Sequence, residues 1–209
     1  MKKYIIILFV FVSILSCNNY KNDENIVISL GGEVATIDPH LNTANIGTVY
    51  IRHFFEGLMK KDKDGKIIPG IAERYEMSDD GLVYTFYLRT NAKWSDGKNF
   101  TADDFLYSYR RFVDPKTAAP YGHLMKPIKN ALKITKGEIP VEELGIKKID
   151  DYTLEITLEN PTAYFLELAD MYLPVRKDII EEYGNTWVLN PESYIYYDGY
   201  GTTVVMPTE

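Results

Sequence analysis

The sequence predicts a mixed α/β (α+β) fold, and two stretches carry most of that prediction. Residues 82–89 alternate apolar and more polar side chains with the period of two that is typical of a half-buried strand. Residues 152–158 repeat this alternation, with Leu154, Ile156 and Leu158 on one side. We therefore expect the two strands to pair in antiparallel fashion and to bury one shared apolar face.

A turn and a helix are predicted directly after the first of these strands. Residues 94–97 read Trp-Ser-Asp-Gly, which favours a turn, because Asp can bond its own backbone and Gly accepts a positive φ. Thr101 is the expected N-cap of the helix. Asp103 and Asp104 fall in its first turn, where the helix dipole favours negative charge. We expect Trp94 to pack against the two paired strands.

Shorter elements are predicted on both sides of this block. Before it, the patterns predict a strand at 26–30, a polar loop at 42–48, a helix over 49–59 that ends near Gly57, a hairpin turn at Asp64-Gly65, a strand from 67–68 and a helical turn at 72–75. After it, they predict a helix stop at Asp114-Pro115, a weak helix over 128–136, a strand over 146–149, and helices over 161–171 and 179–183.

Composition limits the class of protein. The 209 residues are 45% hydrophobic and 13% aromatic, which supports a packed core in one domain or two small ones. The formal net charge is −7, and no segment is rich in Lys or Arg. Such a chain is repelled by nucleic acid and by anionic lipid, so we expect no nucleic-acid partner.

The first 25 residues read as a targeting segment. Lys2 and Lys3 precede an apolar run at 4–15 that is too short to span a bilayer comfortably, so residues 1–16 are predicted to be a signal peptide. Cys17 is the only cysteine and cannot form an internal disulfide. Its position after a small residue resembles a bacterial lipoprotein cleavage site, which implies acylation of Cys17 and a polar tether at 17–25. The alternative is a plain secretory signal with an incidental cysteine.

The sequence offers no pattern for catalysis, metal binding or a cofactor. Three pairs of adjacent carboxylates are expected in turns and caps, because neighbouring residues do not face each other: Asp79-Asp80, Asp103-Asp104 and Asp150-Asp151. Each histidine lacks a ligand four residues away, which favours core or local roles: His40, His53 and His123. A nucleophile elbow, a P-loop and a dinucleotide glycine pattern are all missing. We therefore predict neither an enzyme nor a metal or cofactor site.

Short motifs follow one another in a fixed order between residues 26 and 187. They are Ile-Asp-Pro-His at 37–40, Phe-Phe-Glu-Gly-Leu at 54–58, Pro-Gly-Ile-Ala-Glu at 69–73, Asn-Ala-Lys-Trp-Ser-Asp-Gly at 91–97, Asp-Pro-Lys-Thr-Ala-Ala-Pro-Tyr at 114–121 and Asp-Asp-Tyr-Thr-Leu-Glu-Ile-Thr-Leu at 150–158. In this order they resemble the extracytoplasmic oligopeptide-binding proteins of ABC importers, the peptide/nickel-binding family 5.

The resemblance implies a two-lobed fold of the type II periplasmic-binding-protein kind, which clasps an extended peptide and hands it to a membrane permease. Backbone hydrogen bonds would hold the peptide without regard to its side chains. The implied contacts are Thr43, Ala44 and Asn45, in the loop after Asp-Pro-His, and Tyr121, whose phenol can donate to a peptide carbonyl. Thr43 replaces an acidic residue of relatives, so a charged contact is not expected there. The alternative for Tyr121 is packing beside Pro120.

The resemblance also implies a division of the chain. Residues 56–180 are expected to form an α+β subdomain, and residues 26–55 and 181–209 incomplete pieces of the main lobe. Residues 196–201 only approximate the turn that leads into a second lobe in relatives, and residues 202–209 match nothing. We therefore expect the first lobe alone, through truncation, a frame shift or a fragmentary sequence.

Together these points predict an exported protein, lipid-anchored on the periplasmic or outer face of the membrane. It would capture oligopeptides and deliver them to an ABC permease. Two alternatives stay open. One is a surface or structural lipoprotein without a transport role, and the other is a family member that binds nickel chelates, haem or another small solute.

Overall fold

The computed structural model describes residues 34–189 and 195–197. The chain divides into two units, Met1–Gly31 and Gly32–Glu209, and all described residues belong to the second. The predicted signal peptide, Cys17, the tether at 17–25 and the strand predicted at 26–30 lie outside them. Among the described residues, no helix has both the length and the apolar character needed to cross a membrane.

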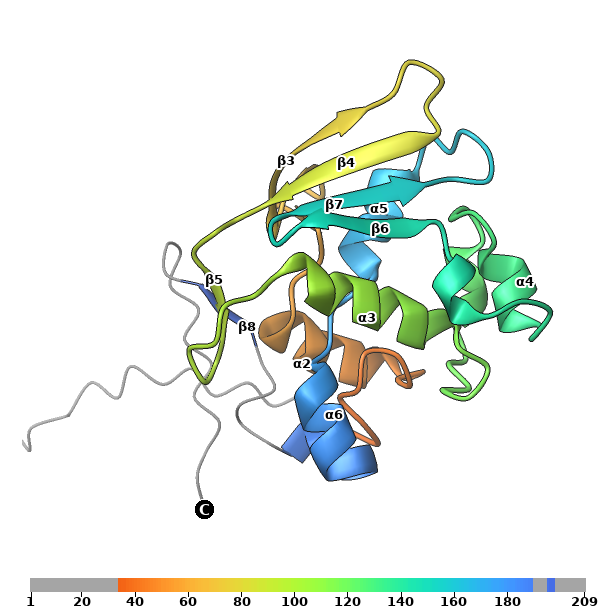
Figure 1. Ribbon diagram of the computed structural model, residues 1–209. Helices are drawn as coiled ribbons and strands as arrows, with labels where there is room; N and C mark the ends of the chain where they lie inside the picture. Colours follow the sequence, from red (N-terminus) through yellow and green to blue (C-terminus); the bar gives the residue numbers. More distant parts are fainter. Residues whose placement is uncertain (1–33, 190–194, 198–209) are drawn as a thin grey trace, which may run out of the picture. The chain divides into compact units, whose positions relative to one another are not determined.

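This unit contains a four-stranded antiparallel sheet, which lies at the top of the view in Figure 1, above α3. Its strands, in spatial order, are β3 (Ala72–Met77), β4 (Val83–Leu88), β7 (Thr153–Thr157) and β6 (Ile146–Asp150). Tyr84 lies opposite Ile156, and Phe86 opposite Leu154. The predicted pairing of the two alternating stretches is therefore confirmed, and so is the strand predicted at 146–149.

The alternation in β4 places every second side chain in the core. Tyr84, Phe86 and Leu88 are buried, whereas the residues between them are only partly covered. Phe165, at the start of α5 (Phe165–Met171), packs on this face with its ring centre 4.8 Å from that of Tyr84. Each fully buried side chain of this size contributes roughly 1.5–3 kcal/mol of hydrophobic free energy.

Helix α3 (Ala102–Val113) begins where the sequence predicts. The Thr101 backbone N–H donates to the Asp104 carboxylate at 2.8 Å, as part of a capping box. The other predicted first-turn acid, Asp103, pairs with Lys148 of β6. At the far end the backbone becomes extended at Asp114, so Asp114-Pro115 ends the helix as expected.

Trp94 ends β5 (Ala92–Trp94), and the predicted turn follows, with Gly97 at φ 87°. Its indole ring is 2% exposed, stacks near Phe100 with ring centres 5.2 Å apart, and donates its N–H to Asp104 at 3.2 Å. The guanidinium of Arg176 lies 5.8 Å from the ring centre. Packing of Trp94 against the β4–β7 pair itself stays a prediction. The backbone of β5 pairs with β8 (Ile195–Tyr197).

Three predicted elements differ from the structure. The helix predicted over 49–59 is α2 (Asn45–Phe54), so it begins inside the predicted loop at 42–48 and ends before Gly57. The helical turn predicted at 72–75 is wrong, because these residues pair with β4 as the edge strand β3. The helix predicted from Pro161 begins only at Phe165, because the chain first turns, with the Phe165 N–H donating to the Thr162 carbonyl at 3.0 Å.

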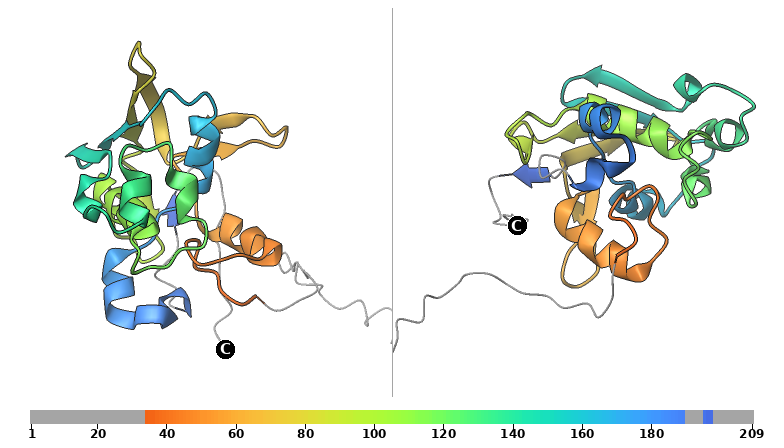
Figure 2. Two further views of the ribbon diagram at one scale, coloured as in Figure 1. Left: turned by 90° about the vertical axis from the view of Figure 1, so that its right-hand side faces the viewer. Right: turned by 90° about the horizontal axis from the view of Figure 1, so that it is seen from below.

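Among the remaining short elements, the predicted hairpin, the weak helix within 128–136 and the helix over 179–183 are confirmed, whereas the short helices Gly122–Met125 and Gly184–Leu189 were not predicted. The hairpin around Gly65 joins β1 (Met59–Lys61) to β2 (Ile67–Pro69) and can be followed in Figure 2. The others are η1 (Gly122–Met125), α4 (Ala131–Thr135), η2 (Val141–Glu143), α6 (Lys177–Tyr183) and η3 (Gly184–Leu189). The predicted division into 26–55, 56–180 and 181–209 stays a prediction.

Candidate functional site

One pocket brings together three of the four side chains that the resemblance singles out. Its volume is about 320 Å³, and Thr43, Asn45 and Tyr121 all line it. Thr43 and Asn45 are exposed, and Tyr121 is 44% exposed. Ala44 does not line the pocket. It is the N-cap residue of α2, and its carbonyl accepts a hydrogen bond from the Thr48 N–H at 3.1 Å.

A single buried amide shapes the polar side of the pocket. The Asn42 side chain donates to the Ala44 carbonyl and to Thr48 Oγ1, each at 3.0 Å, and accepts from the Ala44 N–H at 3.2 Å. Gly47 leaves room for it, because a Cβ there would lie 2.1 Å from Asn42 Oδ1. This arrangement turns Thr43 and Asn45 outward. Our sequence analysis missed Asn42 and Gly47, because nothing in the local pattern separates them from an ordinary polar loop.

Part of the pocket lining is apolar. Phe112, Leu124 and Leu173 line it together with Tyr121. The Tyr172 hydroxyl donates to the Leu124 carbonyl at 2.7 Å and so fixes the η1 turn against the segment after α5. The pocket therefore offers hydroxyl and amide groups together with apolar surface.

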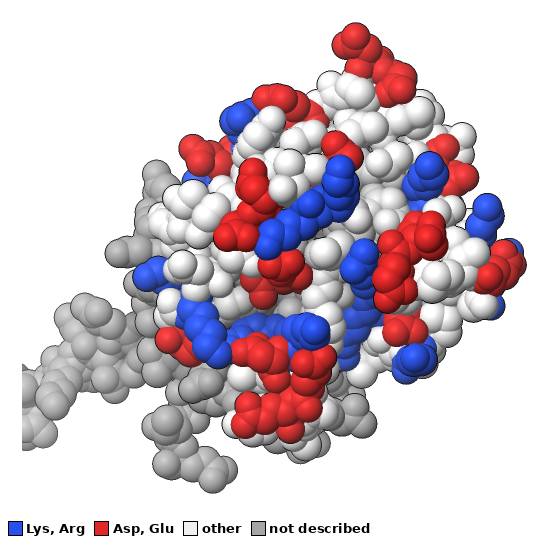
Figure 3. Space-filling view, viewed as in Figure 1, with Lys and Arg blue, Asp and Glu red and all other residues white. Residues whose placement is uncertain are grey.

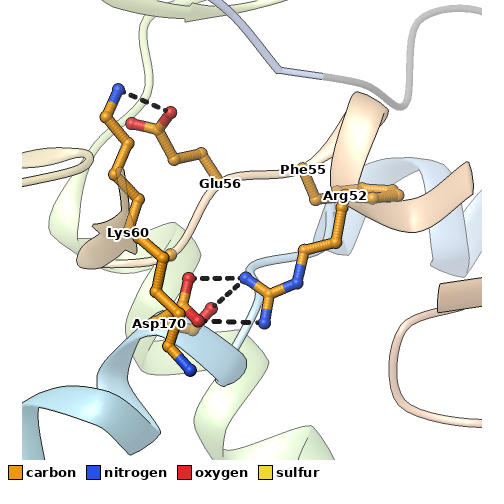
Figure 4. A pocket seen from close by; sticks show the side chains of 7 residues that line it. Arg52, Phe55, Glu56, Lys60 and Asp170 are labelled. Atoms are coloured by element: carbon orange, nitrogen blue, oxygen red, sulfur yellow. Dashed lines mark hydrogen bonds and ion pairs between the residues drawn. The ribbon is translucent and has the colours of Figure 1, made fainter. Parts of the chain in front are cut away.

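Among the residues that the structure describes, Arg52 is the only charged one that lines this pocket. Its guanidinium donates to both carboxylate oxygens of the buried Asp170 on α5, at 2.5 and 3.0 Å, and to the Asp170 carbonyl at 3.0 Å (Figure 4). Such a bidentate pair is well oriented and neutralises the cation. The pocket is therefore effectively uncharged.

Arg52 also lines a second pocket of about 380 Å³, drawn in Figure 4. This second pocket contains Asp170, Lys61 and the Lys60–Glu56 ion pair, whose charged atoms lie 3.2 Å apart. Its charges are largely paired with one another. Basic and acidic side chains also lie side by side on the face shown in Figure 3.

A buried polar cluster lies directly behind the first pocket. Arg111 of α3 donates from Nη2 to Asp38 Oδ2 at 2.8 Å, and from Nη1 to Asp38 Oδ1 at 3.2 Å and to His40 Nδ1 at 2.8 Å. The Trp187 indole N–H also donates to Asp38 Oδ2, at 3.0 Å. Burial opposes ionisation of Asp38, but His40 and the Arg111 guanidinium outweigh it and lower the pKa of Asp38 below its ordinary value.

His40 is part of the core, as expected for a histidine without a metal-ligand pattern. It is 3% exposed, and its Nε2 lies 3.0 Å from the Leu173 carbonyl oxygen. Burial is the main cause that lowers its pKa to about 4. Within the part of the chain that the structure describes, no group of three or more His, Cys, Asp or Glu could hold a metal ion.

The described residues therefore form a mixed α/β unit with an open pocket that is lined by hydroxyl, amide and apolar groups. Residues 66–201 match the family model described as bacterial extracellular solute-binding proteins, family 5 Middle. The chain belongs to this family. Its members are binding proteins rather than enzymes, which confirms the predicted family and the prediction that the chain is not an enzyme.

Known relatives agree with this assignment. The chain is 42% identical over 168 residues to the periplasmic oligopeptide-binding protein OppA of Escherichia coli strain K12, and 40% identical over 165 residues to the probable deoxycholate-binding periplasmic protein YgiS of the same organism. These matches cover 78% and 77% of this chain but 31% of each relative. The chain therefore spans about a third of the length of the curated relatives that it matches.

The structure of Listeria monocytogenes OppA bound to peptide is also similar. The TM-score is 0.75 at 40% sequence identity, and the match covers 79% of this chain and 33% of the Listeria chain. The predicted fold class is thus confirmed: a mixed α/β lobe that corresponds to about a third of an oligopeptide-binding protein.

Proposed function

We propose that this chain contributes to an extracytoplasmic receptor that captures oligopeptides and delivers them to the permease of an ABC importer. The observation that carries the proposal is the convergence of Thr43, Asn45 and Tyr121 on one uncharged pocket, although Tyr121 lies far along the chain from the other two. Relatives named as oligopeptide-binding and dipeptide-binding proteins support peptides as the class of ligand.

The chemistry of the pocket suits an extended peptide. Each peptide unit presents one N–H donor and one C=O acceptor. The Thr43 and Tyr121 hydroxyls and the Asn45 amide can each donate or accept, so they can bond a backbone of any sequence. The apolar surface around Phe112 and Leu173 can cover part of a ligand side chain. Uncharged contacts of this kind favour recognition of the backbone over recognition of charged side chains.

We further propose that the protein is exported and is anchored to the membrane by acylation of Cys17. The support is the short apolar run that ends at Cys17, after Ser16. One acyl chain gives only marginal membrane binding, so a stable anchor requires more than one chain at this residue.

Affinity is the part of the proposal that depends most on the rest of the receptor. Thr43, Asn45 and Tyr121 are exposed in this lobe, so a bound peptide would stay partly in water. Hydrogen bonds that compete with water contribute only about 0.5–1.5 kcal/mol each, and the loss of rigid-body freedom on association costs several kcal/mol or more. We expect binding no tighter than about millimolar by this lobe alone, and tight binding when a second lobe closes over the ligand.

A second candidate ligand is a small amphipathic solute. The relative named as probably deoxycholate-binding is 40% identical to this chain over 165 residues, and several residues that line the pocket are apolar. A surface lipoprotein without a transport role, and a receptor for nickel chelates or haem, remain the weaker alternatives, because no described contact favours them.

A titration of residues 18–209 with trialanine, followed by amide NMR shifts, tests the proposal. We expect the amides of Thr43, Asn45 and Tyr121 to shift with millimolar peptide, and Tyr121→Phe to weaken the effect. Leu132→Ala, a change at an exposed residue of α4 that does not line the pocket, is the matched control. A response to deoxycholate without a response to trialanine would favour the second candidate.

A further inference from the structure

His40 contacts residues of the pocket wall from behind, although it does not line the pocket. His40 follows Pro39, which lines the pocket. The His40 ring stacks on Phe112, with ring centres 4.9 Å apart and an interplanar angle of 25°, and its Nε2 contacts the Leu173 carbonyl. Phe112 and Leu173 also line the pocket. His40 therefore touches the wall through three residues without lining the pocket itself.

The hydrogen bonds of His40 require one protonation state. A guanidinium can only donate, so His40 Nδ1 must accept the bond from Arg111, and the Leu173 carbonyl can only accept, so Nε2 must carry the proton. A second proton on Nδ1 would set one donor against another across 2.8 Å. Protonation of His40 therefore has to break its contact with Arg111.

Two charged groups among the described residues face His40, so its protonation acts through the contact with Arg111. Asp38 and Arg111 are the two that face it, and the Asp38 carboxylate also accepts the His40 backbone N–H at 2.8 Å. Phe112 and the Leu173 carbonyl, from the other packed segments, carry no titratable group. Farther out, the Tyr107 hydroxyl interacts with the charges of Arg111, Glu181 and Asp38, and burial is the main cause that raises its pKa. It does not titrate in acid.

We propose that His40 and Arg111 are positioning residues for the ligand pocket. Neutral His40, which is held by Arg111, keeps residues 39–45, Phe112 and Leu173 in the arrangement that binds ligand. Protonation of His40 breaks its contact with Arg111 and releases these residues from that arrangement. The inference rests on the proposed function only where it concerns ligand affinity. Acidification then lowers affinity without any titrating group in the pocket. The low pKa of His40, about 4, places this release on the acid side of neutrality.

The test is an amide and histidine-ring NMR titration of residues 18–209, which retain the whole Gly32–Glu209 unit, from pH 7 to pH 3.5. The amides of Thr43, Ala44 and Asn45 should move with the same midpoint as the His40 ring, while those of β4 stay in their folded positions. His40→Asn keeps an acceptor for Arg111, and His40→Gln keeps a donor for Leu173. Neither variant can titrate, so the step should vanish in both. His53→Asn, at an exposed histidine, should leave the step unchanged.

Trialanine binding supplies the second readout. The apparent affinity scales with the ligand-competent fraction, so half a pH unit below the His40 midpoint it should fall roughly fourfold in the wild type and stay constant in His40→Asn. Loop amides that do not follow the His40 ring, or a step that persists in His40→Asn, would overturn the inference. If trialanine does not bind even at pH 7, the proposed function fails, while the loop amides still decide whether His40 positions this segment.

Discussion

The indole N–H of Trp187 donates to the carboxylate of Asp38 at 3.0 Å, across a sequence separation of 149 residues. Arg111 binds the same carboxylate from a position 73 residues away. Asp38 therefore joins the segment before α2, the last turn of α3 and the η3 turn. The side chains of Asp38 and Arg111 are only 3% and 12% exposed, so this is a largely buried ion pair with satisfied hydrogen bonds.

Removal of Asp38 should be strongly destabilising. Asp38→Ala leaves the Arg111 charge buried without its partner, and such a loss typically costs about 3–5 kcal/mol. Trp187→Phe removes one hydrogen bond and replaces the buried indole by a smaller ring, but it leaves no charge unpaired, so it should cost less, about 1–3 kcal/mol. Urea unfolding of both variants measures the two losses. A loss for Asp38→Ala no greater than that for Trp187→Phe would show that the ion pair does not hold these segments together.

Trp94 should be one of the most costly core positions. Its ring is 2% exposed and packs near Phe100, and the Arg176 guanidinium lies 5.8 Å from the ring centre. Trp94→Ala should lower the free energy of unfolding by about 3–5 kcal/mol, as large-to-small core changes do. Thermal or urea unfolding measures it. A loss of less than about 1 kcal/mol would mean that the ring is not part of the core.

The dependence of stability on pH should contain two opposing contributions. Burial lowers the pKa of His40 to about 4 from its ordinary 6.5, so its contribution is fully present above pH 6.5 and is lost as the pH falls toward 4. Burial raises the pKa of Asp104 from 3.8 to about 6, so its contribution is present below pH 3.8 and is lost as the pH rises through 6. Each amounts to about 3 kcal/mol, and the two partly cancel in the wild type.

Single variants should separate these contributions. His40→Asn should remove the loss of stability on acidification, and the variant should lose less stability than the wild type between pH 6.5 and pH 4. Asp104→Asn should do the reverse and remove the loss on going from pH 4 to pH 6. Chemical unfolding at a series of pH values gives both slopes. Slopes equal to that of the wild type in both variants would contradict the assignment.

The membrane anchor can be tested on Cys17, which lies outside the described residues. Cells that express the wild type should incorporate labelled palmitate into the protein and retain it in the membrane fraction, because the acylated thiol is the only link to the bilayer in this account. Cys17→Ala should abolish both. Equal labelling of the two proteins would rule out the lipoprotein assignment and favour an incidental cysteine.

Local patterns in the sequence predicted the elements whose causes are local. The alternation in β4 and β7 and the Thr101–Asp104 cap involve neighbouring residues only, and all were found where expected. The helical turn predicted at 72–75 was wrong because these residues form a strand by pairing with β4. This tertiary contact overrides their weak local preference.

The candidate site also depends on tertiary contacts that local sequence patterns do not reveal. Nothing in the spacing of Thr43, Asn45 and Tyr121 places them in one pocket, and only the resemblance to a family suggested them. The Asp38–Arg111–Trp187 cluster was not foreseen at all, since its members lie 73 and 149 residues apart and each looks ordinary in its own segment. A buried ion pair of this kind is visible only once the chain is folded.

The central claim is that the pocket lined by Thr43, Asn45 and Tyr121 binds a peptide backbone, and calorimetry with Tyr121→Phe on a receptor with both lobes tests it most directly. Loss of one hydroxyl hydrogen bond should weaken binding by about 1 kcal/mol, or about fivefold, with similar loss for peptides of different sequence. The lobe of residues 18–209 alone should bind no tighter than about millimolar. Unchanged peptide affinity in Tyr121→Phe, or micromolar binding by the single lobe, would contradict the account.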